Sequence, residues 1–229
     1  MKKFKNAVII AFAMLLVFAL GVGGTIAYFT DITGTLTNTV VAGGFATLEI
    51  EEPKGDGSTA LTNTGGTNQF KIIPGKNLLK DPQVTFTFDS EHDTNAFVFV
   101  KITYGSGWNY ASNKFTATVG AEGDTLVNAL QVSVNTTNWV QVSTGTGFVV
   151  FAYKVDDATN KVTKNSFTDK DILAMSSSKS IIVSKNLTET QCEWIKANSS
   201  IFNLDFKAYA IQDTGFNVNS AWTEVSKLG

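Results

Sequence analysis

The sequence predicts an all-β fold, a jelly-roll-like antiparallel β-sandwich with one or two short helices, preceded by a signal-peptide helix. Three observations predict it. The chain is rich in threonine and other β-branched residues, with only 3 prolines among 229 residues. Short segments alternate between apolar and polar residues, and glycine, asparagine and proline separate them. The 43% hydrophobic and 17% charged residues are also typical of a chain that buries a core.

The first 27 residues have the pattern of a signal peptide. An apolar segment covers residues 7–22, and Thr25-Ile26-Ala27 is a small-x-small cleavage site that ends before Tyr28. Three lysines precede the apolar segment: Lys2, Lys3 and Lys5. A helix of this length spans about 24 Å, less than the ~30 Å hydrocarbon core. We therefore expect cleavage between Ala27 and Tyr28, with an uncleaved anchor as the alternative. Either places the rest of the chain outside the cytoplasm.

Residues 28–41 and 42–229 are expected to form an N-terminal strand segment and one sandwich domain. In the first, Ile32, Leu36 and Val40 alternate with threonines. In the second, period-two alternation predicts strands with one face on a core. These strands cover residues 46–51, 83–89, 96–104, 130–135, 148–155 and 202–210. No internal duplication divides the domain.

Two of these strands are apolar on both faces. Phe97 and Phe99 oppose Val98 and Val100, and the 148–155 segment has the same character. A central strand that is covered on both sides by loops or a helix explains this pattern, and so does an exposed apolar patch used for assembly. We favour the central strand, because buried strands are more common than exposed apolar surfaces.

Helices are expected at two places in the second half of the chain. Thr188, three residues before Gln191, has capping-box spacing, and Trp194 and Ile195 follow. A shorter helix is expected over residues 168–175. The polar segment 156–170 is expected to be a surface loop.

Composition excludes several classes of function. The chain has no arginine, and after the leader it is acidic, which argues against nucleic acid as a partner. Cys192 is the single cysteine and His92 the single histidine, so an internal disulfide, a thiolate zinc cluster and a multi-histidine metal site are excluded.

Several motifs together resemble a known family of exported proteins. Residues 24–31, Gly-Thr-Ile-Ala-Tyr-Phe-Thr-Asp, resemble the junction that SipW-type signal peptidases cut. Asn38 with residues 44–48, the Ile73-Pro74-Gly75-Lys76 segment with residues 80–82, and the strand at 95–100 are similar to later motifs of TasA and camelysin-like proteins. The ending 206–212, with Phe216 and Ala221-Trp222, resembles theirs too. Phe97 and Phe99 depart from the tyrosine and charged residue usual in that strand.

The resemblance implies a secreted jelly-roll protein of a bacterial cell surface or extracellular matrix. TasA-like members are subunits of biofilm fibres and assemble by donor-strand complementation. Camelysin-like members are described as surface metalloproteases. The partners it implies are further copies of the chain, a SipW-type signal peptidase and an accessory matrix protein. Membrane contact is expected only through an uncleaved leader.

The residues offer little for catalysis, and we predict no catalytic residue, metal ligand or cofactor. Glu91-His92-Asp93 are adjacent and, on an extended chain, point to opposite faces, so they converge poorly on a metal. A turn between two strands explains them better. Four acids around the polar segment do not match the EF-hand spacing: Asp156, Asp157, Asp169 and Asp171. Cys192 is expected to be a small buried side chain rather than a cross-linking thiol.

Residues 28–41 are the expected assembly strand. The segment holds one charge, Asp31, and no proline, and cleavage would free its N-terminus. Its apolar residues Ile32, Leu36 and Val40 suit it to pairing with an open sheet edge of another copy. The alternative is pairing within its own subunit as an ordinary edge strand. A non-polymerising accessory protein would then share the same fold.

Overall fold

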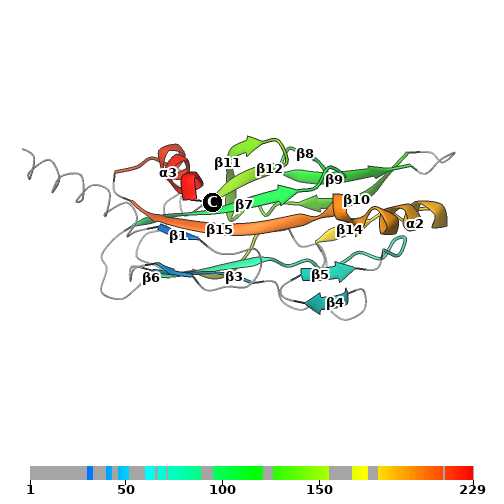
Figure 1. The fold of residues 1–229 in the computed structure, drawn as a ribbon, viewed down its shortest axis with the longest axis horizontal. Helices are drawn as coiled ribbons and strands as arrows, with labels where there is room; N and C mark the ends of the chain where they lie inside the picture. Colours follow the sequence, from blue (N-terminus) through cyan, green and yellow to red (C-terminus); the bar gives the residue numbers. More distant parts are fainter. Residues whose placement is uncertain are drawn as a thin grey trace, which may run out of the picture.

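The computed structural model describes residues 30–32, 40–42, 46–51, 60–64, 67–70, 72–88, 95–120, 126–154, 167–174, 180–213 and 215–228. Their strands pair antiparallel throughout and form stacked sheets with two α-helices, which confirms the all-β sandwich (Figure 1). The signal peptide and its cleavage site, Ala27 and Tyr28, lie outside the described residues.

One layer is a five-stranded sheet, called here the large sheet. Its two central strands, β7 and β15, pair over nine residues each, from Ala96↔Gln212 to Tyr104↔Leu204. In spatial order its strands are β1 (Thr30–Ile32), β15 (Leu204–Gln212), β7 (Ala96–Tyr104), β12 (Phe148–Tyr153) and β11 (Trp139–Gly145).

The opposing layer consists of two four-stranded sheets. The β3 sheet has the order β13 (Phe167–Asp171), β6 (Gln83–Phe88), β3 (Ala46–Glu51) and β2 (Val40–Ala42). The β10 sheet has the order β14 (Ile181–Val183), β10 (Val127–Ser133), β9 (Lys114–Val119) and β8 (Asn109–Ala111). Bridges Leu78↔Ile181 and Val134↔Leu173 join their neighbouring ends. A separate hairpin pairs β4 (Ala60–Thr64) with β5 (Thr67–Phe70).

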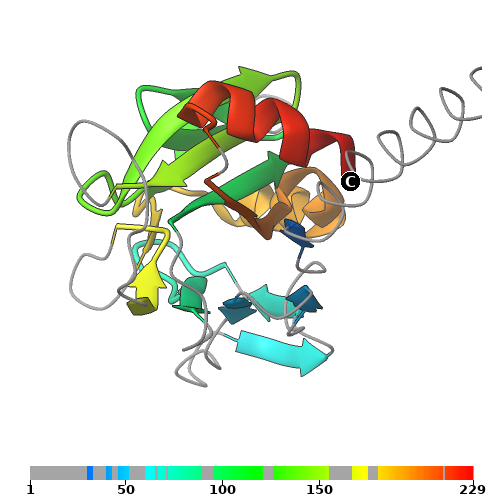
Figure 2. The ribbon, with the colours of Figure 1, turned by 90° about the vertical axis from the view of Figure 1, so that its left-hand side faces the viewer.

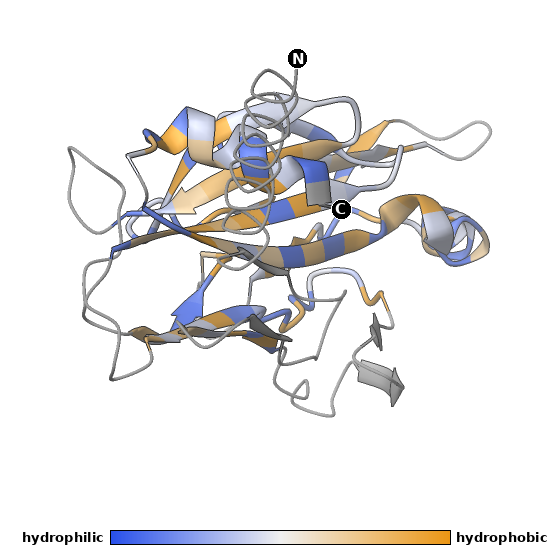
Figure 3. Cartoon of the chain, turned by 60° about the vertical axis from the view of Figure 1, so that its left-hand side comes forward, coloured by the Kyte–Doolittle hydropathy of each residue, from blue (hydrophilic) through white to orange (hydrophobic). Residues whose placement is uncertain are grey.

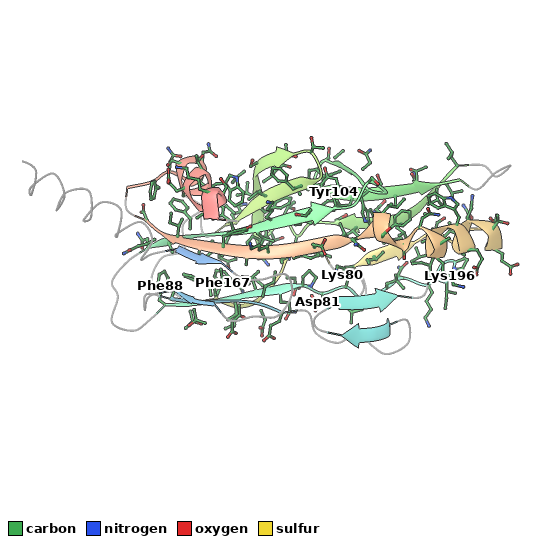
Figure 4. All side chains as sticks on the ribbon, in the orientation of Figure 1. Lys80, Asp81, Phe88, Tyr104, Phe167 and Lys196 are labelled. Carbon is green, nitrogen blue, oxygen red and sulfur yellow. The ribbon has the colours of Figure 1, made fainter. Side chains whose placement is uncertain are left out.

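The main core lies between these two layers. It combines the alternating apolar residues of the inner faces, for example Leu48 and Phe86 from one layer with Val100 and Phe206 from the other, all of them fully buried. Figure 4 shows Phe88 and Phe167 pointing into this space. The strands expected from period-two alternation at 46–51, 83–89, 96–104, 130–135, 148–155 and 202–210 are therefore confirmed to within a few residues.

The outer face of the large sheet has its own smaller core beneath α3 (Val218–Val225). Phe97, Phe99 and Tyr209 are buried there, and the Trp222 ring packs 5.6 Å from the rings of both Phe99 and Tyr209. Figure 2 shows α3 on one side of the large sheet, opposite the second layer. β7 and β12 are thus central strands covered on both faces. The alternative of an exposed apolar patch at Phe97 and Phe99 is wrong.

The helix expected after Thr188 is confirmed. It is α2 (Glu189–Ala197), and the Thr188 and Gln191 side chains form the predicted capping box. Short 3₁₀ turns follow α2 at Ser199–Phe202 and α3 at Ser226–Leu228. The sequence patterns do not predict α3, although Asn217 caps it with Ser220 in the same way.

The expected helix over residues 168–175 is wrong. Residues 167–171 form β13, and Leu173 bridges to Val134. The Trp139 indole N–H also donates to the Asp171 carbonyl, at 2.9 Å. The surface loop expected at 156–170 is wrong at its end for the same reason, because residues 167–170 pair with β6, while 155–166 lie outside the described residues.

We predict that Phe99→Ala lowers the free energy of unfolding by about 3–5 kcal/mol, because it leaves a cavity between the large sheet and α3. Urea denaturation followed by circular dichroism measures the change. Ile182→Ala is the matched control, since Ile182 is 42% exposed and should lose less than about 1 kcal/mol. Equal losses for the two variants would contradict the second core.

Candidate assembly surface

The N-terminal segment places its two described strands at neighbouring edges of the two layers. β1 pairs with β15, with Thr30 opposite Ile211 and Ile32 opposite Tyr209. β2 pairs with β3, with Val40 opposite Leu48. β1 and β2 also contact each other. The N-terminal segment therefore supplies the edge strand of the large sheet and the edge strand of the β3 sheet on the same side of the molecule.

This arrangement differs from the single strand segment expected over residues 28–41. Ile32 lies in β1 and Val40 in β2, whereas Leu36 lies outside the described residues. Gly34 and Asn38 fall between them on the expected apolar face, and both residue types are depleted in strands. Eight residues span up to about 27 Å when extended, more than the ~10 Å between stacked sheets. The segment is thus long enough to pass from one sheet to the other.

β15 offers a much longer edge than β1 occupies. Along one edge, β15 pairs with β7 at all nine positions. Along the other edge, among the residues that the structure describes, β1 pairs with only three residues of β15, Tyr209 to Ile211. The alternation of polar and apolar residues along this strand is visible in Figure 3. Such a long, regular edge favours pairing with a further strand.

The edges on the opposite side of both sheets are irregular. β11 carries a bulge at Val142, between the pairs Gln141↔Phe151 and Ser143↔Val150. β13 carries one between Phe167 and Lys170, where Asp169 has a φ of 50°. Bulges distort an edge and hinder the addition of another strand. The regular ladders β1–β15 and β2–β3 therefore lie on the side that is better suited to strand addition.

Two of the motifs that suggested the family have structural roles. Residues 206–212 belong to β15, and Trp222 of α3 packs on its Tyr209. In the segment at 73–76, Gly75 has a φ of 72°, and its N–H donates to the Ser184 carbonyl at 3.1 Å. That glycine therefore permits a turn that ties the segment before β6 to the end of β14.

The structure describes only two of the residues considered for catalysis or metal binding, Asp169 and Asp171. His92, with Glu91 and Asp93, lies outside the described residues, as do Asp156 and Asp157. Asp169 and Asp171 do lie within them, and each side chain accepts a hydrogen bond, from Thr85 Oγ1 at 3.3 Å and from Gln83 Nε2 at 2.9 Å. Among the described residues, no group of three or more His, Cys, Asp or Glu side chains could hold a metal ion.

Cys192 lies on α2 and packs, partly buried, against the main core. Burial raises the pKa of its thiol, and the charges of Glu193 and Glu189 raise it further. The reactive thiolate is therefore disfavoured at neutral pH. This environment suits the small packing side chain expected from the sequence.

Comparisons with known proteins give no relative: no family model, no curated protein and no solved structure matches the chain. Within the described residues, no helix has the length and apolar character needed to cross a membrane.

Burial raises the pKa of three tyrosines among the described residues. Burial raises the pKa of Tyr110 to about 12, although its hydrogen bond with Asn113 lowers the value, and burial also raises the pKa of Tyr153 and Tyr209. The Tyr110 hydroxyl lies 2.6 Å from Gln141 Oε1. Folding thus favours the neutral phenol, and this contribution to stability is complete below pH 10 and is lost as the pH rises towards 12.

We predict that Tyr110→Phe makes the loss of stability between pH 10 and 12 shallower than in the parent protein. Chemical denaturation at several alkaline pH values measures the slope, and tyrosinate absorbance reports the ionisation directly. Tyr104→Phe is the control. An unchanged slope for Tyr110→Phe would show that Tyr110 does not ionise with unfolding in this range.

Proposed function

We propose that the chain is a secreted bacterial structural protein of the TasA-like type, a subunit of an extracellular matrix fibre that assembles by donor-strand exchange. In this proposal a SipW-type signal peptidase removes residues 1–27, and the body is a jelly-roll sandwich. Residues 28–41 of one copy then leave their own sheet edges and pair with β15 and β3 of the next copy. Further copies of the chain are the partners, together with an accessory matrix protein.

The observation that supports this most strongly is the shortness of the edge pairing. Among the described residues, β1 pairs with three of the nine positions of β15, and β2 pairs with three of the six positions of β3. A backbone hydrogen bond contributes about 0.5–1.5 kcal/mol net, so releasing either strand costs only a few kcal/mol. A neighbouring copy restores the same bonds, because both copies have the same sequence.

Exchange of this kind produces an open polymer. Each copy has one donor segment and one pair of acceptor edges, so the contact joins two different surfaces. Such a heterologous contact extends into a filament unless the rotation between copies closes a ring. The affinity comes from main-chain hydrogen bonds, and the apolar side chains of the donor select the register.

A second candidate is a non-polymerising accessory protein of the same fold. It is favoured by one specific observation: β1 and β2 pair with strands of their own chain. In that protein residues 28–41 would be permanent edge strands. The two candidates predict different partners for β1, and two experiments distinguish them.

We predict that deletion of residues 28–41 abolishes filaments, because it removes the donor and leaves the acceptor edges empty. Negative-stain microscopy and sedimentation of the exported protein measure assembly. Replacing the segment with a flexible Gly/Ser sequence of equal length is the control for length, and it should also fail to assemble. A synthetic peptide of residues 28–41 should bind the deletion protein, about one per chain. Filaments formed by the deletion protein would rule out strand exchange.

We also predict that a cysteine pair at Asp31 and Ala210 forms disulfides between chains in assembled protein. These residues are Cα partners in the β1–β15 register, within the distance that a disulfide bridges. Asp31→Cys and Ala210→Cys in a Cys192→Ala background should give covalent ladders on a non-reducing gel after assembly. The matched control pairs Val98→Cys with Ala210→Cys, which face each other across β7 and β15 and stay within one chain. Only intrachain bonds in both proteins would favour the accessory protein.

A further inference from the structure

Two lysines lie directly opposite each other on the outer face of the large sheet. Lys101 on β7 and Lys207 on β15 are Cα partners. Their ammonium groups rest on aromatic rings, Lys101 Nζ at 5.1 Å from the centre of Phe148 and Lys207 Nζ at 5.3 Å from that of Tyr209. Like charges directly opposite across a strand pair are destabilising. Neither lysine forms an ion pair with any described residue.

This pair lies on the part of the outer face that the α3 core does not include. That core covers Phe97, Phe99, Tyr209 and Ile211, whereas the next row along the sheet, Thr103 and Asp205, is exposed. Asp205 belongs to the same face but forms no ion pair with either lysine. The surface is therefore a strip of sheet with two adjacent positive charges. We call it the lysine strip, defined by Lys101, Lys207 and Thr103.

The opposite outer face of the sandwich, on the β3 sheet, is acidic. Glu49 and Glu51 alternate with buried residues along β3, and the hydrogen bonds of Thr85 and Gln83 bring two acids of β13 onto the same face. Gln83 Nε2 also donates to Asp81 Oδ2, at 3.0 Å. The acids of this face, called here the acidic face, are Glu49, Glu51, Asp81, Asp169 and Asp171.

We propose that the lysine strip is a docking surface for the acidic face of a second copy of the chain. Both surfaces are sheet faces, and their charges are complementary. The main core lies between the two sheets, so the two surfaces point to opposite sides of one subunit (Figure 2). The contact is therefore heterologous and repeats from copy to copy across the thickness of the sandwich.

This contact is independent of strand exchange. Strand exchange uses the edges of the sheets, whereas the docking contact uses their faces. In filaments, it would bind neighbouring filaments side by side. Exposed ion pairs are individually weak and are screened over about 10 Å at 0.1 M salt. The association is consequently weak and sensitive to salt, whereas strand-exchanged filaments depend on hydrogen bonds and burial and withstand salt.

Charge reversal on each surface tests the contact. The exported protein is compared at 20 mM and 500 mM salt, as conditions of choice bracketing physiological screening, by sedimentation and by microscopy of filament bundles. Lys101→Glu with Lys207→Glu should weaken low-salt association about tenfold or more. Glu49→Lys with Glu51→Lys should do the same. The protein with all four changes should associate again, because the complementarity is reversed but retained.

Lys114→Glu with Lys185→Glu is the matched control, since both side chains are exposed and the change in net charge is the same. It should leave association unchanged. Asp205→Asn should strengthen association, because it removes an acid beside the lysine strip. Circular dichroism verifies that each variant is folded.

Failure of the four-fold variant to recover association, or equal weakening by the control pair, would overturn the docking contact. So would parent protein that shows no salt-dependent association at all. The deletion of residues 28–41 separates this result from the proposed function. If strand exchange is wrong, filaments persist without the segment; if docking is wrong, filaments form in every charge variant and bundle equally.

Discussion

The large sheet depends on one constraint: the backbone of its two nine-residue central strands must be hydrogen-bonded, because most of both faces is buried. β7 comes closest to meeting this requirement, because β15 pairs with it at all nine positions and β12 at five. β15 has β7 on one side, while among the described residues the other side has only the three-residue β1. A strand with buried faces and a partly paired edge gains from further pairing, since exposed ladder groups bind a compatible strand. The rest of the molecule's behaviour follows from how that edge is covered.

The apolar residues on both faces of the large sheet also explain why α3 follows β15. An apolar inner face packs on the second layer, whereas the outer residues Phe97, Phe99, Tyr209 and Ile211 need a cover of their own. α3 supplies it through Ala221, Trp222 and Val225. Because α3 follows β15 directly in the chain, it covers the end of the sheet at which β15 finishes. The row that carries Lys101 and Lys207 consequently stays outside that core.

Local patterns predicted six strands of the sandwich, β3, β6, β7, β10, β12 and β15, together with α2, but not the elements set by distant contacts. Leu48, Phe86 and Phe206 sit in clear period-two segments, and Thr188 and Gln191 have capping spacing, so these features are visible in short windows. The sequence pattern predicts a helix where β13 forms. The strand character of β13 comes from its pairing with β6 and from the hydrogen bond that the Trp139 indole donates to the Asp171 carbonyl. α3 was missed because eight residues hold too few turns for a clear 3.6-residue period. Its Asn217 cap with Ser220 was the available signal.

The candidate site was predictable in part for the same reason. The strand character of residues 28–41 is local, and two parts of the segment are strands. Their division between two sheets is not local, because it depends on where the edges of β15 and β3 end up in the fold. The opposed lysines could not be seen at all, since Lys101 and Lys207 are 106 positions apart in the chain and meet only through the β7–β15 register.

In the proposed assembly, edges and faces give the subunit two independent directions of association. Edge pairing through residues 28–41 is directional and involves many backbone hydrogen bonds, so it suits the long axis of a filament. Face contacts between the lysine strip and the acidic face are electrostatic and screened by salt, so they suit adjustable contacts between filaments. A matrix protein needs both, because strength along a fibre and reversible cohesion between fibres have different physical requirements. In the proposed assembly the first is encoded by backbone geometry and the second by a few charged side chains, so either can change without the other.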